Sequence, residues 1–279
     1  MNIGINTWGL SQKFKKDFKK TLNELKDIGI REIEPCFVLS NSFNFLKRIG
    51  FYIGLTINGT SGSNWFAHLI EDKMNIVLEY GFNVNYVHLT FIMPDKKALG
   101  KMIPTAIKLA KKYHIKGYVI SMLAKNKKTA EKYFDDIRKF SAALKEVGCK
   151  TIYHNHSEEM NGTLEYFLDN IPDLELEFDV GWSIIGGADP KNIITKYMDR
   201  ICVIHFKDAL NNSKKDLSIP IGKGSLNVDE IISLTINNYN NGKVEYIIDQ
   251  DASKNDIIYD IKEGKNRIEE SIKKYAKFI

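Results

Sequence analysis

Residues Thr151 to Glu159 read TIYHNHSEE, and this stretch decides how the rest of the chain is interpreted. Its first half is apolar and β-branched, as in a buried β-strand, and two histidines follow where the strand would end. Successive side chains of a strand point to opposite faces, so His154 and His156 would share one side. What that side faces depends on how the neighbouring strands end.

A strand-then-helix rhythm runs along the whole chain. Short β-branched runs alternate with longer segments whose apolar residues recur every three or four positions, a pattern typical of parallel strands joined by helices. The predicted strands are 2–7, 31–35, 52–57, 85–91, 116–122, 150–155, 174–180, 201–207 and 245–250. The clearest predicted helices are 14–28, 97–113, 129–147, 190–198 and 228–239. Gly29 and Gly148 follow two of these helices and suit the left-handed conformation that ends a helix.

This order predicts an α/β fold, a single (β/α)8 TIM barrel over residues 1–279, because no Pro-, Gly- or Ser-rich linker interrupts it. Such a barrel has eight strands, whereas nine are predicted, so one segment is surplus. The helical spacing that resumes near Asp72 leads into the strand at 85–91, which makes residues 37–66 an insertion after the second strand. That loop lies on the C-terminal face of a barrel, where we expect it to form a partial lid over the active site.

Composition excludes several classes of protein. The chain has 279 residues, of which 43% are hydrophobic and 27% charged, as in an ordinary soluble globular protein. No basic region followed by an apolar run opens the chain, and no stretch is long enough to span a bilayer, so we expect a cytoplasmic protein without a membrane partner. Cys36, Cys149 and Cys202 have no paired spacing and are expected to be free thiols in a reducing compartment.

The net charge of +5 raises the question of a nucleic-acid partner. The lysines gather in KKDFKK, AKKYHIK and AKNKKTAEK, which have helical spacing and also carry acids or apolar residues. A solvated helix face explains these segments better than a nucleic-acid surface does. We therefore expect no nucleic-acid partner.

Ionisable residues recur at the ends of the predicted strands. They are Glu34 in REIEP, His88 in YVHLT, His154 and His156 in TIYHNH, Asp179 in LEFDVGW, His205 and Lys207 in CVIHFKD, and Asp249 in YIIDQD. The C-terminal ends of barrel strands meet at one mouth, so these side chains would come within reach of one another. Taken singly, His88 can be a core residue and Glu34 a loop cap. Trp182 can be plain packing or a platform for the apolar face of a sugar.

Four of these residues form a possible metal-ligand set on four successive predicted strands: His154, Asp179, His205 and Asp249. Two imidazoles with two carboxylates suit Mn²⁺, Zn²⁺, Co²⁺ or Fe²⁺ rather than a soft thiolate-bound metal. Such a cation can act as a Lewis acid on adjacent hydroxyl and carbonyl oxygens and acidify the carbon-bound proton between them. A nearby carboxylate or histidine would be the base. No GxGxxG follows the first strand, and no GxxxxGK[ST] or GxSxG motif occurs.

On these motifs the chain resembles the sugar phosphate isomerase/epimerase family with the xylose isomerase-like TIM barrel. The match is closest to the subgroup whose fifth strand reads YHNHxxE, here Tyr153-His154-Asn155-His156 with Glu159. The resemblance continues in GINTWGL, REIEP, FDVGW with GGADP, IHFKD, IGKGSLN and IIDQD, and so spans essentially the whole chain.

The resemblance implies a divalent metal ion, a site at the C-terminal mouth and a small-molecule partner, a keto sugar, sugar phosphate or inosose. The implied reaction is isomerisation, epimerisation or dehydration through an enediolate-type intermediate. The expected roles are metal ligation by His154, Asp179, His205 and Asp249, proton transfer by His156, Glu159 or Glu34, oxyanion stabilisation by Lys207, and substrate binding by His88, Trp182 and Trp8.

Three positions depart from the family pattern. Many relatives carry glutamate where this chain has His154, and most carry glutamate where it has the shorter Asp249. Other relatives carry histidine at the place of Trp182, so His156 or Glu159 would take over as proton carrier.

The same residues leave other functions open. The unusual His154 and Asp249 also suit a non-catalytic sugar-binding protein on a degenerate barrel. An abasic-site endonuclease-like enzyme uses the same fold with a multi-zinc cluster, but it needs ligands beyond the four, and we expect further histidine and acid positions to be sparse. The sequence does not define an interface, and a homodimer is left open.

Overall fold

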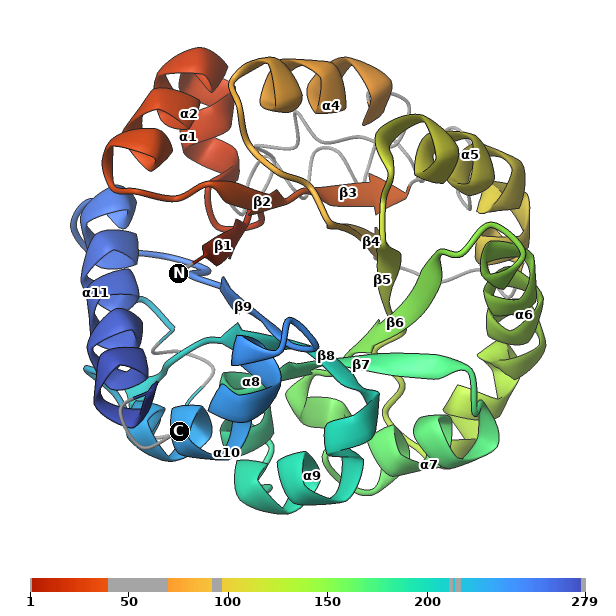
Figure 1. The fold of residues 1–279 in the computed structure, drawn as a ribbon. Helices are drawn as coiled ribbons and strands as arrows, with labels where there is room; N and C mark the ends of the chain where they lie inside the picture. The colour runs from red at the N-terminus through yellow and green to blue at the C-terminus, as the bar shows by residue number, and fades with distance from the viewer. Residues whose placement is uncertain (1, 40–69, 92–96, 211–212, 214–216, 277–279) are drawn as a thin grey trace.

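A ring of parallel strands forms the centre of the computed structural model (Figure 1). The structure describes residues 2–39, 70–91, 97–210, 213 and 217–276. Within them the strands are β1 (Ile3–Asn6), β2 (Glu32–Glu34), β3 (Cys36–Leu39), β4 (Tyr86–Phe91), β5 (Gly117–Ser121), β6 (Lys150–His154), β7 (Leu174–Asp179), β8 (Ile201–Phe206) and β9 (Glu245–Ile248). All ladders are parallel, and the predicted TIM barrel is confirmed.

Pro35 explains how nine described strands occupy eight places in the ring. β2 pairs with β1, and after Pro35 the same segment continues as β3 and pairs with β4. Proline has no N–H to donate to a ladder, but its carbonyl still accepts a hydrogen bond from the His88 amide at 2.9 Å. Glu32 also bridges to Asn83, just before β4. The second place in the barrel is therefore one strand divided by a proline.

The predicted insertion lies mostly outside the described residues. Residues 37–39 belong to β3 and therefore to the barrel, whereas 40–69, including the predicted strand 52–57, are not described. The other eight predicted strands are all present in the ring, each within a few residues of its predicted bounds. A lid formed by the insertion stays a prediction.

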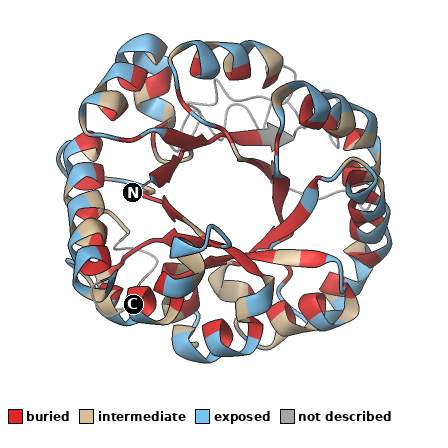
Figure 2. Cartoon of the chain, in the orientation of Figure 1, coloured by how far each residue is buried: buried red, intermediate tan, exposed pale blue. Residues whose placement is uncertain are grey.

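Helices surround the ring on its outer side (Figure 1). They are α1 (Ser11–Lys16), α2 (Phe18–Asp27), α4 (Ile70–Glu79), α5 (Ala98–Tyr113), α6 (Lys127–Lys145), α7 (Thr163–Asn170), α8 (Val180–Ile185), α9 (Pro190–Tyr197), α10 (Val228–Asn240) and α11 (Ile257–Tyr275), with the short 3-10 helices η2 (Ser157–Glu159) and η3 (Met198–Arg200). Figure 2 shows most of the described strand residues buried, with exposed or half-buried ones such as Lys150 and Glu175 near strand starts, and on the helices buried residues alternate with an exposed face. This is the pattern of an apolar stripe that packs against a sheet.

The prediction of a single first helix is wrong. The spacing predicted one helix over 14–28, but the structure divides it at Asp17, whose backbone is extended with φ −157°. The Asp17 side chain accepts a hydrogen bond from the Lys20 amide at 2.9 Å, which makes Asp17 the N-cap of α2. The two predicted glycine caps are confirmed, since Gly29 and Gly148 have φ values of 83° and 71°.

The interior of the barrel changes from apolar to ionisable along the strands. Ile152, Val203 and Ile247 belong to one buried apolar cluster inside the ring. Each fully buried side chain of this kind contributes roughly 1.5–3 kcal/mol to folding. Two residues further along, on the same face of each strand, stand His154, His205 and Asp249. The polar site therefore rests on an apolar floor that closes the barrel below it.

The outer surface carries the lysine-rich segments. Lys15, Lys16, Lys111, Lys112 and most of their counterparts are exposed on α1, α5 and neighbouring helices. The three cysteines are free and buried, as predicted. Within the described ranges, none of the helices has both the length and the apolar character that a membrane span requires.

Candidate active site

The C-terminal strand ends bring the four predicted metal ligands together. His154 ends β6, Asp179 ends β7, His205 lies near the end of β8 and Asp249 directly follows β9. All four are buried, and each offers a ligand atom that lies within 4.8 Å of the others. The strand register produces this arrangement, because Asp179 and His205 stand opposite each other in the β7–β8 ladder.

Each of the two carboxylates keeps one buried oxygen without a hydrogen-bond partner among the described residues. Asp179 Oδ1 accepts from the Trp182 amide at 2.7 Å and caps α8, while Oδ2 has no partner. Asp249 Oδ2 forms an ion pair with Lys207 Nζ at 2.8 Å, while Oδ1 has no partner. Both ring nitrogens of His205 also lack a hydrogen bond.

These unpartnered atoms fit a bound cation. A buried polar atom without a partner costs roughly 1–3 kcal/mol, so several in one place call for an additional group. The atoms are carboxylate oxygens and imidazole nitrogens, which are ligands that first-row divalent metals accept. The side chains of His154, Asp179, His205 and Asp249 therefore have the chemistry that a divalent metal site requires.

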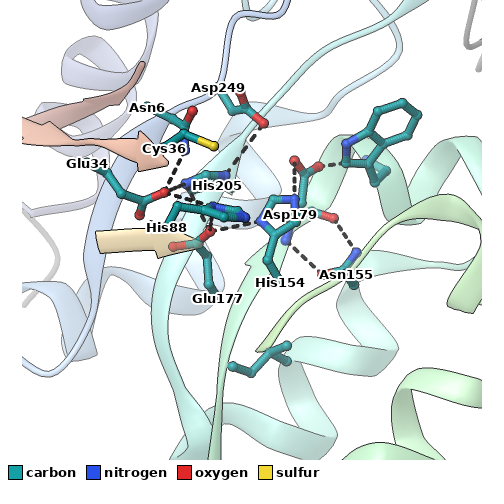
Figure 3. A network of polar contacts seen from close by, with 12 residues as sticks. Asn6, Glu34, Cys36, His88, His154, Asn155, Glu177, Asp179, His205 and Asp249 are labelled. Carbon is teal, nitrogen blue, oxygen red and sulfur yellow. Dashed lines mark hydrogen bonds and ion pairs between the residues drawn. The ribbon is translucent and has the colours of Figure 1, made fainter. Parts of the chain in front are cut away.

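Glu177 is a site residue that the sequence reasoning missed. Its Oε1 atom accepts from His154 Nδ1 at 2.8 Å and lies 3.2 Å from His205 Nε2 and 3.6 Å from His88 Nδ1. Figure 3 shows the three imidazoles gathered around this carboxylate. The signal was present in the sequence, because Glu177 precedes Asp179 by two residues and must face the same side of β7.

Glu34 and His88 form a second contact pair beside the ligands. Glu34 Oε1 accepts from Asn6 Nδ2 at 2.6 Å, lies 3.2 Å from His88 Nδ1 and 3.4 Å from His205 Nε2. Glu34 is buried, and His88 lines the cavity. Glu34, His88 and Glu177 also belong to sets that could hold a metal ion. The expectation that histidine and acid positions beyond the four ligands are sparse is therefore wrong.

Burial shifts the pKa values of the four residues in different directions. Burial raises the pKa of Asp179 to about 7, although the charge of Lys207 opposes the rise. Burial also acts to raise the pKa of Asp249, but Lys207 and His205 outweigh it and hold that pKa well below its ordinary value. Burial and the neighbouring imidazoles hold the pKa of His154 far below its ordinary value, so His154 is neutral. Neutral imidazole and ionised carboxylate are the forms that bind a cation.

The pKa of His205 is raised, whereas that of His154 is lowered. Burial alone would lower the pKa of His205, but the carboxylates of Glu177 and Glu34 raise it well above its ordinary value. Burial and repulsion from Glu34 raise the pKa of Glu177, whereas the charge of His205 outweighs burial and lowers the pKa of Glu34. A proton in this group would thus be shared between His205 and Glu177, and a cation bound at His205 would compete with it.

A cavity of about 310 Å³ opens at the mouth of the barrel. The residues that line it are Asn6, Trp8, Cys36, His88, Thr90, Ser121, Leu123, His154, His156, Trp182, Asp249 and Asp251. Its volume suits a small polar molecule. The three residues predicted to bind substrate, His88, Trp182 and Trp8, all lie on its wall. The ring of His156 lies 4.9 Å from that of His154 and 5.4 Å from that of Trp182.

Lys207 lies behind the cavity wall. Its Nζ atom is 2.8 Å from Asp249 Oδ2 and 2.6 Å from Asp251 Oδ2, and it sits 5.2 Å from the centre of the Trp182 ring. Burial acts to lower the pKa of Lys207, but the two carboxylates outweigh it and raise the pKa. Lys207 is not among the residues that line the cavity. The structure therefore places Lys207 against Asp249 and Asp251 rather than on the surface of the cavity.

Glu159 is placed differently from the other predicted proton carriers. Its carboxylate accepts from the Tyr153 hydroxyl, from the Ala124 amide at 3.0 Å and from the His156 amide at 2.8 Å. Burial raises its pKa to about 7. It does not line the cavity but joins the segments that follow β5 and β6. This placement supports a structural role for Glu159 rather than proton transfer to a molecule in the cavity.

The remaining residue of the YHNHxxE motif, Asn155, ties two strand ends together. Asn155 Oδ1 accepts from the Asp179 amide at 2.9 Å, and Asn155 Nδ2 donates to the Asp179 carbonyl at 3.1 Å. Both bonds are buried, and they fix the end of β7 against the end of β6. The motif thus places His154 and Asp179 relative to each other.

Comparison with curated proteins finds relatives that match only part of the chain. No family model matches the chain. An inosose dehydratase from Geobacillus kaustophilus is 31% identical over 85 residues, which is 28% of this chain and 27% of that protein. An inosose dehydratase from Lacticaseibacillus casei is 34% identical over 85 residues, 28% of each protein. The chain therefore matches these curated relatives over about a quarter of their length.

Solved structures resemble the chain over nearly its whole length. A sugar phosphate isomerase/epimerase from Parabacteroides distasonis has a TM-score of 0.67 at 20% identity, over 94% of this chain and 91% of that one. The IOLI protein with a zinc atom has a TM-score of 0.66 at 12% identity and 99% coverage of both chains. A xylose isomerase-like TIM barrel protein from Mycobacterium smegmatis, in complex with magnesium, has a TM-score of 0.65 at 11% identity, over 98% and 97% of the two chains. The resemblance noted in the sequence is confirmed at the level of the fold.

Proposed function

We propose that this protein is a divalent-metal-dependent isomerase, epimerase or dehydratase that removes a proton next to the carbonyl group of a keto sugar, sugar phosphate or inosose. The observation that carries the proposal is the convergence of Asp179 Oδ2, Asp249 Oδ1 and the His205 ring nitrogens, all buried and without a hydrogen bond among the described residues, beside a cavity of about 310 Å³. The names of the partial relative and of the structural neighbours support a substrate of this class.

The residues that would hold the metal ion are His154, Asp179, His205 and Asp249. When bound there, the ion supplies Lewis-acid polarisation of a carbonyl oxygen and the adjacent hydroxyl, which acidifies the carbon-bound proton between them. Two imidazole nitrogens with two carboxylate oxygens favour Zn²⁺, Fe²⁺, Co²⁺ or Mn²⁺ over Mg²⁺, which prefers oxygen ligands alone.

Two imidazoles on the cavity wall can move protons. Burial lowers the pKa of His156 to about 3, so the ring is neutral at pH 7, and its Nδ1 atom has no hydrogen-bond partner among the described residues. His88 is backed by Glu34 Oε1 at 3.2 Å, which is the arrangement of a general base with the group that orients it. An isomerase must take a proton from one atom and return one to another, and two such groups satisfy this requirement.

The two tryptophans complete the substrate pocket. Trp8 and Trp182 line the cavity and give it apolar walls above its polar base. An aromatic face stacks on the C–H face of a sugar ring, while the imidazoles and carboxylates contact its oxygens. A cytoplasmic location and a homodimer stay predictions.

The experiment that tests the proposal is deuterium wash-in from heavy water into a panel of keto sugars, their phosphates and inososes. The protein is used after removal of metal with a chelator and again after reloading with Zn²⁺, Co²⁺ or Mn²⁺. We expect exchange at the carbon next to the carbonyl only in the reloaded protein, and its loss in His156→Gln or His88→Gln. If sugars raise the melting temperature of the protein but no deuterium enters any of them, with or without metal, the proposal is contradicted and a sugar-binding protein is supported.

A further inference from the structure

We infer that Glu177 is a positioning residue that holds the two histidine ligands, His154 and His205, in the orientation needed to bind the metal ion. The inference rests on the proposed metal site and adds a residue to it. Glu177 is fully buried and is not among the residues that line the cavity, so it does not contact a substrate there. Its side chain contacts the imidazoles of His154, His205 and His88 and the carboxyl group of Glu34.

The contact with His154 fixes which ring nitrogen is free. An ionised Glu177 can only accept a hydrogen bond, so in that form the 2.8 Å contact from His154 Nδ1 to Glu177 Oε1 places the proton on Nδ1. A neutral imidazole carries one ring proton, which leaves the lone pair on Nε2. Nε2 is the nitrogen that faces Asp179, 4.0 Å from its Oδ2 atom. Glu177 thus directs the lone pair of His154 toward the other ligands.

The contact with His205 is an ion-pair contact rather than a hydrogen bond, and it places Glu177 behind the second ring as well. The Nε2 atom of His205 lies 3.2 Å from Glu177 Oε1, while its Nδ1 atom faces Asp249 Oδ2 at 3.6 Å. The same oxygen, Glu177 Oε1, therefore contacts one nitrogen of each ring. The other nitrogen of each ring, His154 Nε2 and His205 Nδ1, faces a carboxylate ligand, Asp179 or Asp249. Metal-bound histidines commonly donate their second ring N–H to a carboxylate in this way, which fixes the tautomer and the ring plane.

Because the side chain of Glu177 is buried and has no exposed surface, no water molecule can take over its role as hydrogen-bond acceptor for His154 Nδ1. Without that acceptor, the ring is free to place its proton on Nε2 or to rotate, and either change removes one ligand. Replacing Glu177 should therefore weaken metal binding without removing any ligand atom.

The test compares Glu177→Met, which removes the acceptor, with Glu175→Met, a control on the same strand whose carboxylate contacts Lys150 at 2.8 Å instead of the site. Zn²⁺ affinity of the metal-free proteins is measured by competition with a chromophoric chelator. We expect Glu177→Met to bind Zn²⁺ about 10–100-fold more weakly than wild type and Glu175→Met to bind it equally well. Equal affinity in wild type and Glu177→Met would overturn the inference while leaving the metal site intact. Failure of the wild type to bind Zn²⁺ would instead overturn the proposed function, and the inference with it.

A second measurement needs no variant of Glu177. Nitrogen-15 NMR of histidine side chains reports the tautomer of each neutral ring, and His154 is identified by the signal missing from His154→Gln. We expect metal-free wild type to carry the His154 proton on Nδ1, and Glu177→Met, which offers no carboxylate acceptor, to lose this preference. A wild-type His154 with its proton on Nε2 contradicts the inference, whatever the variant does.

Discussion

Lys207 Nζ lies 2.8 Å from Asp249 Oδ2, and both side chains are buried inside the barrel. Asp249 Oδ2 is thus paired with the Lys207 ammonium group, whereas Asp249 Oδ1 has no hydrogen-bond partner among the described residues. The ion pair explains how an aspartate remains ionised in a buried place. Lys207 also neutralises part of the negative charge that the carboxylates of the site accumulate.

Replacing Lys207 with methionine should destabilise the metal-free protein. The change leaves Asp249 and Asp251 without their counter-charge, and breaking a buried pair by removing one partner costs about 3–5 kcal/mol. Urea unfolding measures the loss. Lys145→Met is the control, because Lys145 pairs with Asp173 at 2.7 Å on the surface and should contribute about 1 kcal/mol or less. Equal effects of the two substitutions would contradict the role given to Lys207.

Replacing Asp179 with asparagine should abolish metal binding and leave the fold intact. The asparagine oxygen can still accept from the Trp182 amide and cap α8, since Asn and Asp are equally good caps. The unpartnered anionic oxygen is lost, and Zn²⁺ affinity should fall by more than the roughly 10–100-fold expected of a residue behind the ligands. Metal analysis of the purified variant and its far-UV spectrum give the two readouts. Wild-type metal content in Asp179→Asn would contradict the ligand assignment.

Asp208 should be required for stability rather than for metal binding. Its carboxylate accepts from the amides of Ala209, Gly222, Gly224 and Leu226 at 2.8–3.0 Å. An asparagine turns its NH₂ group toward two of these donors, either the buried pair or the partly buried glycine pair, and the loss of two hydrogen bonds to a charged acceptor costs roughly 3–6 kcal/mol. Asp189→Asn, at an N-cap where asparagine serves equally well, should change the free energy of unfolding little. Similar unfolding midpoints for Asp208→Asn and wild type would show that the four contacts contribute little.

Glu159 should make the stability of the protein fall between about pH 4.5 and 7. Burial raises its folded pKa from 4.5 to about 7, so the folded state binds more protons than the unfolded state in this range. The stabilisation is complete below the unfolded pKa and is lost as pH rises through the folded one, a difference of about 3 kcal/mol. Glu159→Gln cannot titrate and should show a flatter profile of unfolding free energy against pH. Parallel profiles for the two proteins would contradict the assignment.

The sequence predicted the architecture well because the barrel repeats one pattern. Parallel strands buried on both faces read as continuous apolar runs, and eight of the nine predicted strands lie in the ring. Two local breaks in the secondary structure were not predicted from this pattern. Asp17 divides the first helix because its side chain prefers to cap, and Pro35 divides the second strand because it lacks an N–H.

The site was predicted in part, and the gaps have physical reasons. His154, Asp179, His205 and Asp249 were found because they end strands, and strand ends converge in a barrel. Glu177 was not predicted because it lies two residues before the end of β7, whereas the predicted ligands end or directly follow their strands or lie one residue from the end. Glu159 was expected to carry protons, but only the folded chain shows its oxygens bonded to the Ala124 and His156 amides.

The most direct test of the account is an anomalous-scattering measurement on crystals grown with Zn²⁺. The account predicts one anomalous peak at the barrel mouth, with His154 Nε2, His205 Nδ1 and the free oxygens of Asp179 and Asp249 at about 2.0–2.2 Å from it. A crystal saturated with Zn²⁺ that shows no peak between Asp179 and His205 would contradict the central claim that these residues form a metal centre.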